Sequence, residues 1–143
     1  MSSLRVGIFS LLATGVVSVG LAALSTPANA HAACKYAPSG GAGLCVYYSP
    51  DGFNARWATA GTANHEGKFF VANEWGSGGA GEPVRNNAAS AENFSINCQG
   101  EVWRFPNEAG TVIRVARAPF ANASVVQNLG VLRNDNASQG WLC

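Results

Sequence analysis

A short segment of this chain occurs twice. Residues 84–90 read Val-Arg-Asn-Asn-Ala-Ala-Ser and residues 132–138 read Leu-Arg-Asn-Asp-Asn-Ala-Ser, so four of the seven positions are identical. An aromatic segment is repeated as well, because residues 46–50 read Val-Tyr-Tyr-Ser-Pro and residues 102–106 read Val-Trp-Arg-Phe-Pro. Since both pairs occur in the same order, we expect the fold to consist of two copies of one unit.

The two copies differ in length. The aromatic segments are 56 positions apart and the Arg-Asn segments are 48 apart, so the first copy contains an insertion of about eight residues. We expect this insertion to lie in the Gly-rich segment 76–81, which reads Gly-Ser-Gly-Gly-Ala-Gly.

Residues 1–30 have the pattern of an export signal. Arg5 gives the positive start, residues 6–24 form an apolar run, and residues 28–30 (Ala-Asn-Ala) form a cleavage site of small residues. A membrane anchor is one alternative, because the run approaches the ~20 residues of a bilayer span, and a lipoprotein attached at Cys34 is another. We expect cleavage before His31, which predicts a secreted, extracellular protein of residues 31–143.

The charge of the mature chain excludes two classes of partner. Without Arg5 it carries eight basic and eight acidic side chains, and no run of like charges. Nucleic acids and anionic membranes select clustered Lys and Arg. We therefore expect no nucleic-acid partner, and no membrane contact once the signal is removed.

All four cysteines lie in the mature part of the chain. An even number of cysteines behind an export signal is typical of disulfides rather than of a metal site. Of the three connectivities that four cysteines allow, we expect Cys34 with Cys45 and Cys98 with Cys143. Each bridge would contribute about 3–4 kcal/mol in the chain-entropy model.

The mature sequence predicts an all-β fold. Short aromatic and β-branched runs recur between clusters of Gly, Pro, Asn and Ser, and no segment keeps helical spacing over three turns. The expected strands are residues 44–48, 55–59, 68–72, 93–98, 101–105, 111–116 and 125–130. About four strands per copy without crossover helices predict two tandem Greek-key units, residues 34–92 and 93–143, in one small sandwich.

The repeated turn is rich in Asn and Ser. Its polar residues are Asn86, Asn87 and Ser90 in the first copy and Asn134, Asp135 and Ser138 in the second. We interpret them as structural, because such side chains satisfy backbone groups in loops that no sheet reaches. The functional alternative is a calcium site built from the same side chains.

These features resemble a known family, the small secreted actinobacterial metallopeptidase inhibitors of βγ-crystallin-like fold. The resemblance rests on the Cys34–Cys45 loop with its Pro-Ser-Gly-Gly segment 38–41, the Cys-Val-Tyr-Tyr strand, and the two Arg-Asn turns. It covers nearly all of the mature chain. It implies a βγ-crystallin-like sandwich and an inhibitory function.

Two departures limit what the resemblance implies. In calcium-binding βγ-crystallin units, oxygen ligands precede the hydrophobic-Arg step, and residues 78–83 and 126–131 do not supply such ligands. We therefore predict no metal. The characterised inhibitor has a second, short disulfide loop, whereas Cys98 and Cys143 are far apart, so its inhibitory residues are not carried over.

Residues for catalysis are scarce. The mature chain contains two histidines, His31 and His65, without the second His that a zinc protease needs one helical turn away. It also lacks a G-x-S-x-G segment. We interpret His65 as a surface-loop residue and predict no enzymatic activity and no cofactor. Carboxylates that could still form a glycosidase pair are Glu66, Glu74, Glu82 and Glu101.

The leading functional hypothesis is inhibition of an extracellular protease, of the metallopeptidase class that the resemblance implies, by a rigid substrate-like loop. One candidate loop, residues 117–122, displays Arg117, Pro119, Phe120 and Asn122, and the other is the Gly-rich segment 75–82. Core packing is the alternative interpretation of Phe120.

Two other functions remain open. A module for cell-wall glycan or another polysaccharide would use exposed indoles, from among Trp57, Trp75, Trp103 and Trp141. A structural or stress protein of βγ-crystallin-like fold would need neither a projecting loop nor an aromatic platform.

Overall fold

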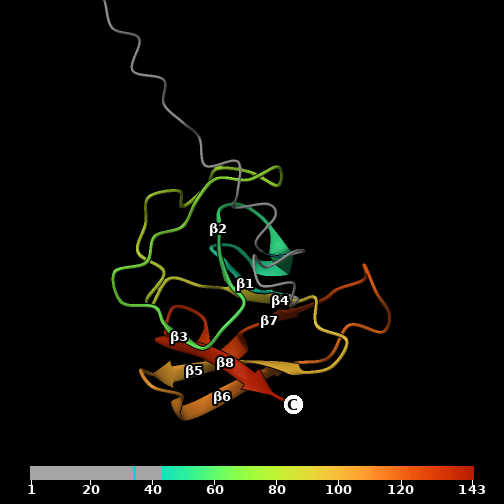
Figure 1. Ribbon diagram of the computed structural model, residues 1–143. Coiled ribbons are helices and arrows are strands. Elements are labelled where there is room, and N and C mark those ends of the chain that lie inside the picture. Colours follow the sequence, from blue (N-terminus) through green and yellow to red (C-terminus); the bar gives the residue numbers. More distant parts are fainter. Residues whose placement is uncertain (1–33, 35–42) are drawn as a thin grey trace, which may run out of the picture.

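The computed structural model describes Cys34 and residues 43–143. The predicted export signal at residues 1–30 lies outside the described residues, as does the Pro-Ser-Gly-Gly segment 38–41. In the described part, eight strands form two four-stranded antiparallel sheets that pack as a sandwich (Figure 1), which confirms the all-β prediction. No helix in this part is long and apolar enough to span a bilayer.

Each half of the chain supplies four strands. The first half contains β1 (Leu44–Tyr47), β2 (Arg56–Thr59), β3 (Ala63–Asn64) and β4 (Ser90–Asn93). The second half contains β5 (Gln99–Phe105), β6 (Ala109–Val115), β7 (Val125–Asn128) and β8 (Ser138–Leu142). Two single-turn 3-10 helices, η1 (Pro50–Gly52) and η2 (Gly130–Leu132), lie in the connections.

The two halves exchange one strand each. One sheet has the order β2-β1-β4-β7, and the other has the order β3-β8-β5-β6. Strand β3 therefore leaves its own half to pair with β8, and β7 leaves its half to pair with β4. Neither sheet is complete without a strand from the other half of the chain.

The strand registers relate the two halves residue by residue. Tyr47 of β1 pairs with Ser90 of β4, and Trp103 of β5 pairs with Ser138 of β8. These pairs keep the same offsets, 56 and 48, that separate the repeated segments in the sequence. Matching positions in the sequence are therefore matching positions in the sheets.

The main core lies between the sheets, and strand β1 is covered on both faces. Leu44 and Val46 point into the main core, whereas Cys45 and Tyr47 point outward and pack with Cys34. All four β1 residues are consequently buried. The other fully buried members of the main core are Ala55, Phe70, Val84, Ala88, Ala91, Val102, Val115, Leu129 and Leu132.

The two repeated turns are hydrogen-bonded to each other. The backbone N–H of Asn86 donates to the carbonyl of Asn136 at 2.8 Å, and the N–H of Asn134 donates to the carbonyl of Ala88 at 2.9 Å. Asn86 and Asn134 both have positive φ, 61° and 57°, a conformation that Asn tolerates better than most residues. The Arg-Asn repeat is thus a reciprocal backbone contact between the halves.

Both predicted disulfides form. Cys34 is bonded to Cys45 and Cys98 to Cys143, so no cysteine is left free. The first bridge attaches the segment before β1 to the outer face of that strand. The second attaches the chain end after β8 to the connection between β4 and β5.

The structure corrects several expected strand positions. Residues 68–72 form isolated bridges at Phe69 and Val71 instead of a regular strand, and the strand expected at 93–98 lies earlier, as β4. Strands β3 and β8 were not predicted. The insertion is also longer than expected, because residues 65–89 connect β3 to β4 whereas residues 129–137 connect β7 to β8.

Candidate functional site

The predicted inhibitory loop lies between β6 and β7, at residues 116–124. Phe120 is 68 % exposed, the largest exposure of any aromatic side chain among the described residues. The interpretation of Phe120 as a core residue is therefore wrong. Arg117, Pro119 and Asn122 are exposed as well, and Asn122 has a positive φ of 66°.

The base of this loop is held by buried polar groups. The side-chain amide of Asn93, which is fully buried, donates to the carbonyls of Val115 and Ala116 at 3.2 and 3.0 Å and to that of Cys98 at 2.9 Å. The N–H of buried Ala118 donates to the carbonyl of Ser95 at 2.8 Å. The loop is thereby tied to the Cys98–Cys143 bridge.

A second surface feature is an open hollow of about 180 Å³ on the outer side of the β2-β1-β4-β7 sheet. Its lining residues are Asp51, Gly52, Phe53, Trp75, Glu92 and Val126. The rings of Phe53 and Trp75 meet edge to face, with centroids 6.5 Å apart and an interplanar angle of 89°. Both rings are more than half exposed.

The hollow is lined by the carboxylate of Glu92, which is hydrogen-bonded to two hydroxyl groups. Glu92 accepts hydrogen bonds from the hydroxyl of Tyr47 and, at 2.6 Å, from the hydroxyl of Ser124. Burial, and then the neighbouring Glu92, raise the pKa of Tyr47 above its ordinary value, so this phenol keeps its proton and donates. Ser124 is the last residue of the Phe120 loop, so Glu92 connects the hollow to the end of that loop.

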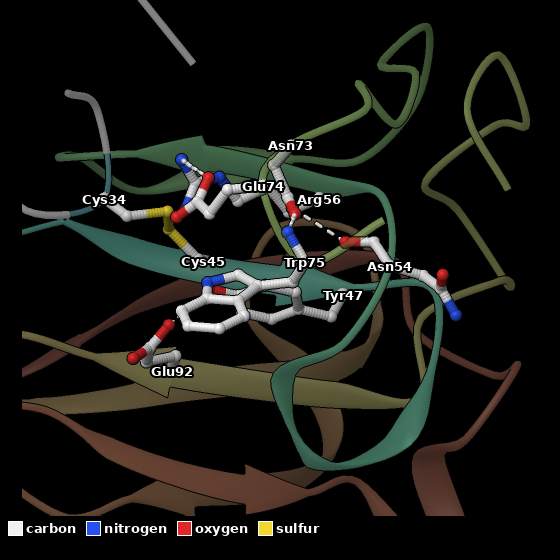
Figure 2. A network of polar contacts seen from close by, with 9 residues as sticks. All are labelled: Cys34, Cys45, Tyr47, Asn54, Arg56, Asn73, Glu74, Trp75 and Glu92. Atoms are coloured by element: carbon white, nitrogen blue, oxygen red, sulfur yellow. Dashed lines mark hydrogen bonds and ion pairs between the residues drawn. A yellow bond between two sulfur atoms is a disulfide. The ribbon is translucent and has the colours of Figure 1, made fainter. Parts of the chain in front are cut away.

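The long insertion places Trp75 at the hollow. In Figure 2, Glu92 lies on one side of the Trp75 ring, with Arg56 and Glu74 on the other. The side-chain amide of Asn73 donates to the carbonyl of Asn54 at 2.7 Å, and the N–H of Asn54 donates to the carbonyl of Trp75 at 3.2 Å. These bonds fix the tip of the insertion against the residues that precede β2.

His65 is fully buried, so its interpretation as a surface-loop residue is wrong. The side-chain amide of Asn136 lies 2.7 Å from Nδ1, and the side-chain carbonyl of Gln139 lies 3.1 Å from Nε2. An amide N–H at Nδ1 leaves the ring hydrogen on Nε2. Burial lowers the pKa of His65 to about 4, so this ring is neutral and structural at ordinary pH.

Three of the four glutamates proposed for a carboxylate pair form ion pairs with arginines. Glu66 pairs with Arg85, Glu74 with Arg56, and Glu101 with Arg114. These pairs involve three different arginines on separate parts of the fold. Within residues 34 and 43–143, no three His, Cys, Asp or Glu side chains are grouped as metal ligands.

The polar residues of the repeated turn bond mainly to backbone. Asn87 donates to the carbonyl of Pro83 at 2.9 Å, and Asp135 forms an ion pair with Arg104 at 2.7 Å. Ser90 and Ser138 are both buried. Asn86 and Asn134 contribute the backbone contacts described above.

The four tryptophans, all in the described part, do not form a row on the surface. Trp75 is 56 % exposed, whereas Trp57, Trp103 and Trp141 are half-buried. Trp141 donates to the carbonyl of Ala60 at 2.9 Å, as buried indoles commonly do.

No protein-family model, curated protein or solved structure matches the chain. The function is therefore inferred from the loop and the hollow. Sequence reasoning singled out Phe120 and Trp75 but missed Asp51, Phe53, Glu92 and Val126. These four come from three separate segments without a shared motif, the turn after β1, strand β4 and strand β7, which only the fold brings together.

Proposed function

We propose that this protein is a secreted inhibitor of metallopeptidases that acts through the loop at residues 116–124. The observation that carries the proposal is the exposed Phe120 on a loop whose base is buried and bonded. The resemblance of the sequence to the metallopeptidase inhibitors indicates metallopeptidases as the class of target. The two disulfides fit an oxidising compartment, as expected of an exported protein.

The loop would bind the protease cleft as a substrate does, with Phe120 in a side-chain pocket. Pro119 restricts the backbone beside Phe120, and Asn93 and Ser95 hold the base. Because little conformational freedom is lost on binding, more of the contact energy remains for affinity. The same support would keep the loop in place if its peptide bond were attacked, so that the products would not leave.

The sheet topology supports the finer proposal of two tandem Greek-key units of βγ-crystallin-like fold. The strand exchange of β3 and β7, the matching registers, and the reciprocal turn contact all relate residues 34–92 to residues 93–143. This scaffold carries many roles, so the inhibitory function rests on the loop and not on the fold.

The test is a titration of a thermolysin-like protease with the purified exported protein. We expect stoichiometric inhibition with the inhibitor recovered intact, and loss of inhibition in Phe120→Ala. Val131→Ala is the matched control, because Val131 is 77 % exposed but lies in η2. The proposal is wrong if no protease of this class is inhibited, or if both variants inhibit equally.

A polysaccharide-binding role is the second candidate, because Trp75 and Phe53 expose two aromatic faces at one hollow. Pull-down on insoluble peptidoglycan and chitin tests it in parallel. Retention that is lost in Trp75→Ala, together with absence of inhibition, would favour this role over the first.

A further inference from the structure

The hollow beside Trp75 offers hydrogen-bond acceptors and aromatic faces. Its two charged lining residues, Asp51 and Glu92, are both acidic, and its aromatic rings come from Phe53 and Trp75. Of its lining residues, none is a Lys or Arg. The N–H of Gly52, a donor at its edge, is already bonded to the hydroxyl of Ser90 at 3.0 Å.

The two carboxylates have neutral partners within the described chain. Glu92 accepts from two hydroxyls, those of Tyr47 and Ser124, and Asp51 accepts from the side-chain amide of Asn128 at 2.7 Å. Hydroxyls and amides stabilise a carboxylate without neutralising its charge. The hollow therefore keeps a negative potential, unlike Glu66, Glu101 and Asp135, which are each paired with an arginine.

The nearby guanidinium of Arg56 does not make the potential of the hollow positive. Arg56 is buried, and it forms an ion pair with Glu74 at 3.9 Å. The guanidinium also interacts with the hydroxyl of Tyr47, which donates to Glu92. Against this one cation stand three carboxylates, those of Glu74, Glu92 and Asp51, so the sum of the charges stays negative.

We propose that the hollow binds a cationic group on an apolar stem, namely the alkylammonium or guanidinium of a Lys or Arg side chain in a partner polypeptide. The π-face of an indole attracts such a cation, and carboxylates give it charge-assisted hydrogen bonds. A neutral sugar needs donors as well as acceptors, and this lining has few donors to offer. The stem would lie against Val126 and the ring of Phe53.

The size of the hollow agrees with a single side chain. Pockets for drug-sized molecules have volumes of about 300–1,000 Å³, whereas this one has about 180 Å³. The lining contains no residue of the Phe120 loop, although Glu92 is bonded to Ser124 at the end of that loop, so the polypeptide need not be a protease.

The experiment is an NMR titration of the ¹⁵N-labelled exported protein, with the Trp75 indole N–H as reporter. The probes are the amides of N-acetyl-lysine and N-acetyl-arginine, with the uncharged norleucine and citrulline analogues as isosteres. Chitin oligosaccharides form a third arm. Free lysine methyl ester distinguishes a small amine from a peptide side chain.

Three variants and one control complete the design. Trp75→Ala removes the π-face, Glu92→Gln removes one charge, and Asp51→Asn removes the other. Asn107 occupies the position that matches Asp51, with a φ of 60° against 59°, so Asp51→Asn suits the local backbone. Phe69→Ala is the control, because this ring is 55 % exposed outside the hollow.

We expect the charged amides to bind at least tenfold more tightly than their isosteres, with binding weakened by added salt. Each hollow variant should weaken it at least fivefold, and Phe69→Ala should not. Equal binding of charged and uncharged probes, unchanged binding in Trp75→Ala, or preferential binding of chitin oligosaccharides would each overturn the proposal. Protease inhibition is measured separately, so the failure of one proposal does not imply the failure of the other.

Discussion

Leu44 of β1 and Gly100 of β5 occupy matching positions in the two halves and meet in the core. A Cβ atom at Gly100 would lie 2.5 Å from Cδ1 of Leu44, well inside van der Waals contact. At this contact between the sheets there is room for only one large side chain. The repeat must therefore differ here, with Leu in one copy and Gly in the other.

Gly100→Ala should destabilise the protein by about 1–3 kcal/mol, because an added methyl group overpacks a filled core. The measurement is the free energy of unfolding in urea. Gly61→Ala is the control, since no atom lies within 4 Å of its added Cβ. The double variant Leu44→Val with Gly100→Ala should recover part of the loss, and strict additivity of the two changes would argue against direct contact.

Ser90→Ala and Ser138→Ala should each cost about 1–3 kcal/mol. Ser90 donates to the carbonyl of Ser49 at 2.7 Å and accepts from Gly52 at 3.0 Å, while Ser138 donates to the carbonyl of Phe105 at 2.7 Å and accepts from Glu108 at 3.1 Å. Loss of either hydroxyl leaves backbone groups of a hairpin unpaired. Urea unfolding measures the loss in free energy of unfolding, with the exposed Ser77→Ala as control. Losses near zero for Ser90→Ala and Ser138→Ala would contradict the prediction.

Stability should decrease as the pH falls from about 6.5 to about 4. The ordinary pKa of His is 6.5, and burial lowers that of His65 to about 4, so the unfolded chain binds the proton first. The contribution is complete above pH 6.5 and is lost as the pH falls through this window, by roughly 3 kcal/mol in total. Protonation would also place a hydrogen on Nδ1 against the amide of Asn136.

Urea unfolding between pH 4 and pH 7.5 measures this effect. His65→Gln is the comparison, because Gln does not titrate, so its stability should lack this component of the pH dependence even if it is lower throughout. Identical slopes for the two proteins in the window would show that His65 is not the group responsible.

Replacing both Cys98 and Cys143 by Ala should destabilise the protein by about 4 kcal/mol, and replacing both Cys34 and Cys45 by about 3 kcal/mol. The difference follows from sequence separations of 45 and 11 residues, because the longer loop restricts the unfolded chain more. Denaturant unfolding compares the pairs. The Cys98–Cys143 variant should also weaken protease inhibition more, since that bridge borders the base of the Phe120 loop.

The sequence predicted the fold class because short aromatic and β-branched runs recur between turn-forming clusters and no segment keeps helical spacing. The repeated segments predicted two units, and the four cysteines predicted two disulfides. Strand β8 was missed because Ser138–Leu142 contains no β-branched residue, and β3 because two residues carry no periodicity. Residues 68–72 have strand-like composition, but they belong to the insertion and form only isolated bridges, Val71 with Arg56 and Phe69 with Pro83.

Burial was the hardest property to predict. His65 stands in a polar segment, Asn-His-Glu-Gly, which indicates a surface loop. Its partners Asn136 and Gln139 lie more than 70 positions away in the other half, and no local pattern connects them. The hollow was missed for the same reason, since its residues come from the turn after β1, the insertion, β4 and β7 and meet only in the folded chain.

The exchange of β3 and β7 has a consequence for the history of such a chain. A single ancestral half would have lacked the fourth strand of its sheet, and two identical subunits could have completed both sheets by each contributing one strand to the other. Gene duplication and fusion would then have linked the two subunits of this dimer in one chain. The Leu and Gly now facing each other at positions 44 and 100 are a kind of asymmetry that only the fused gene could acquire.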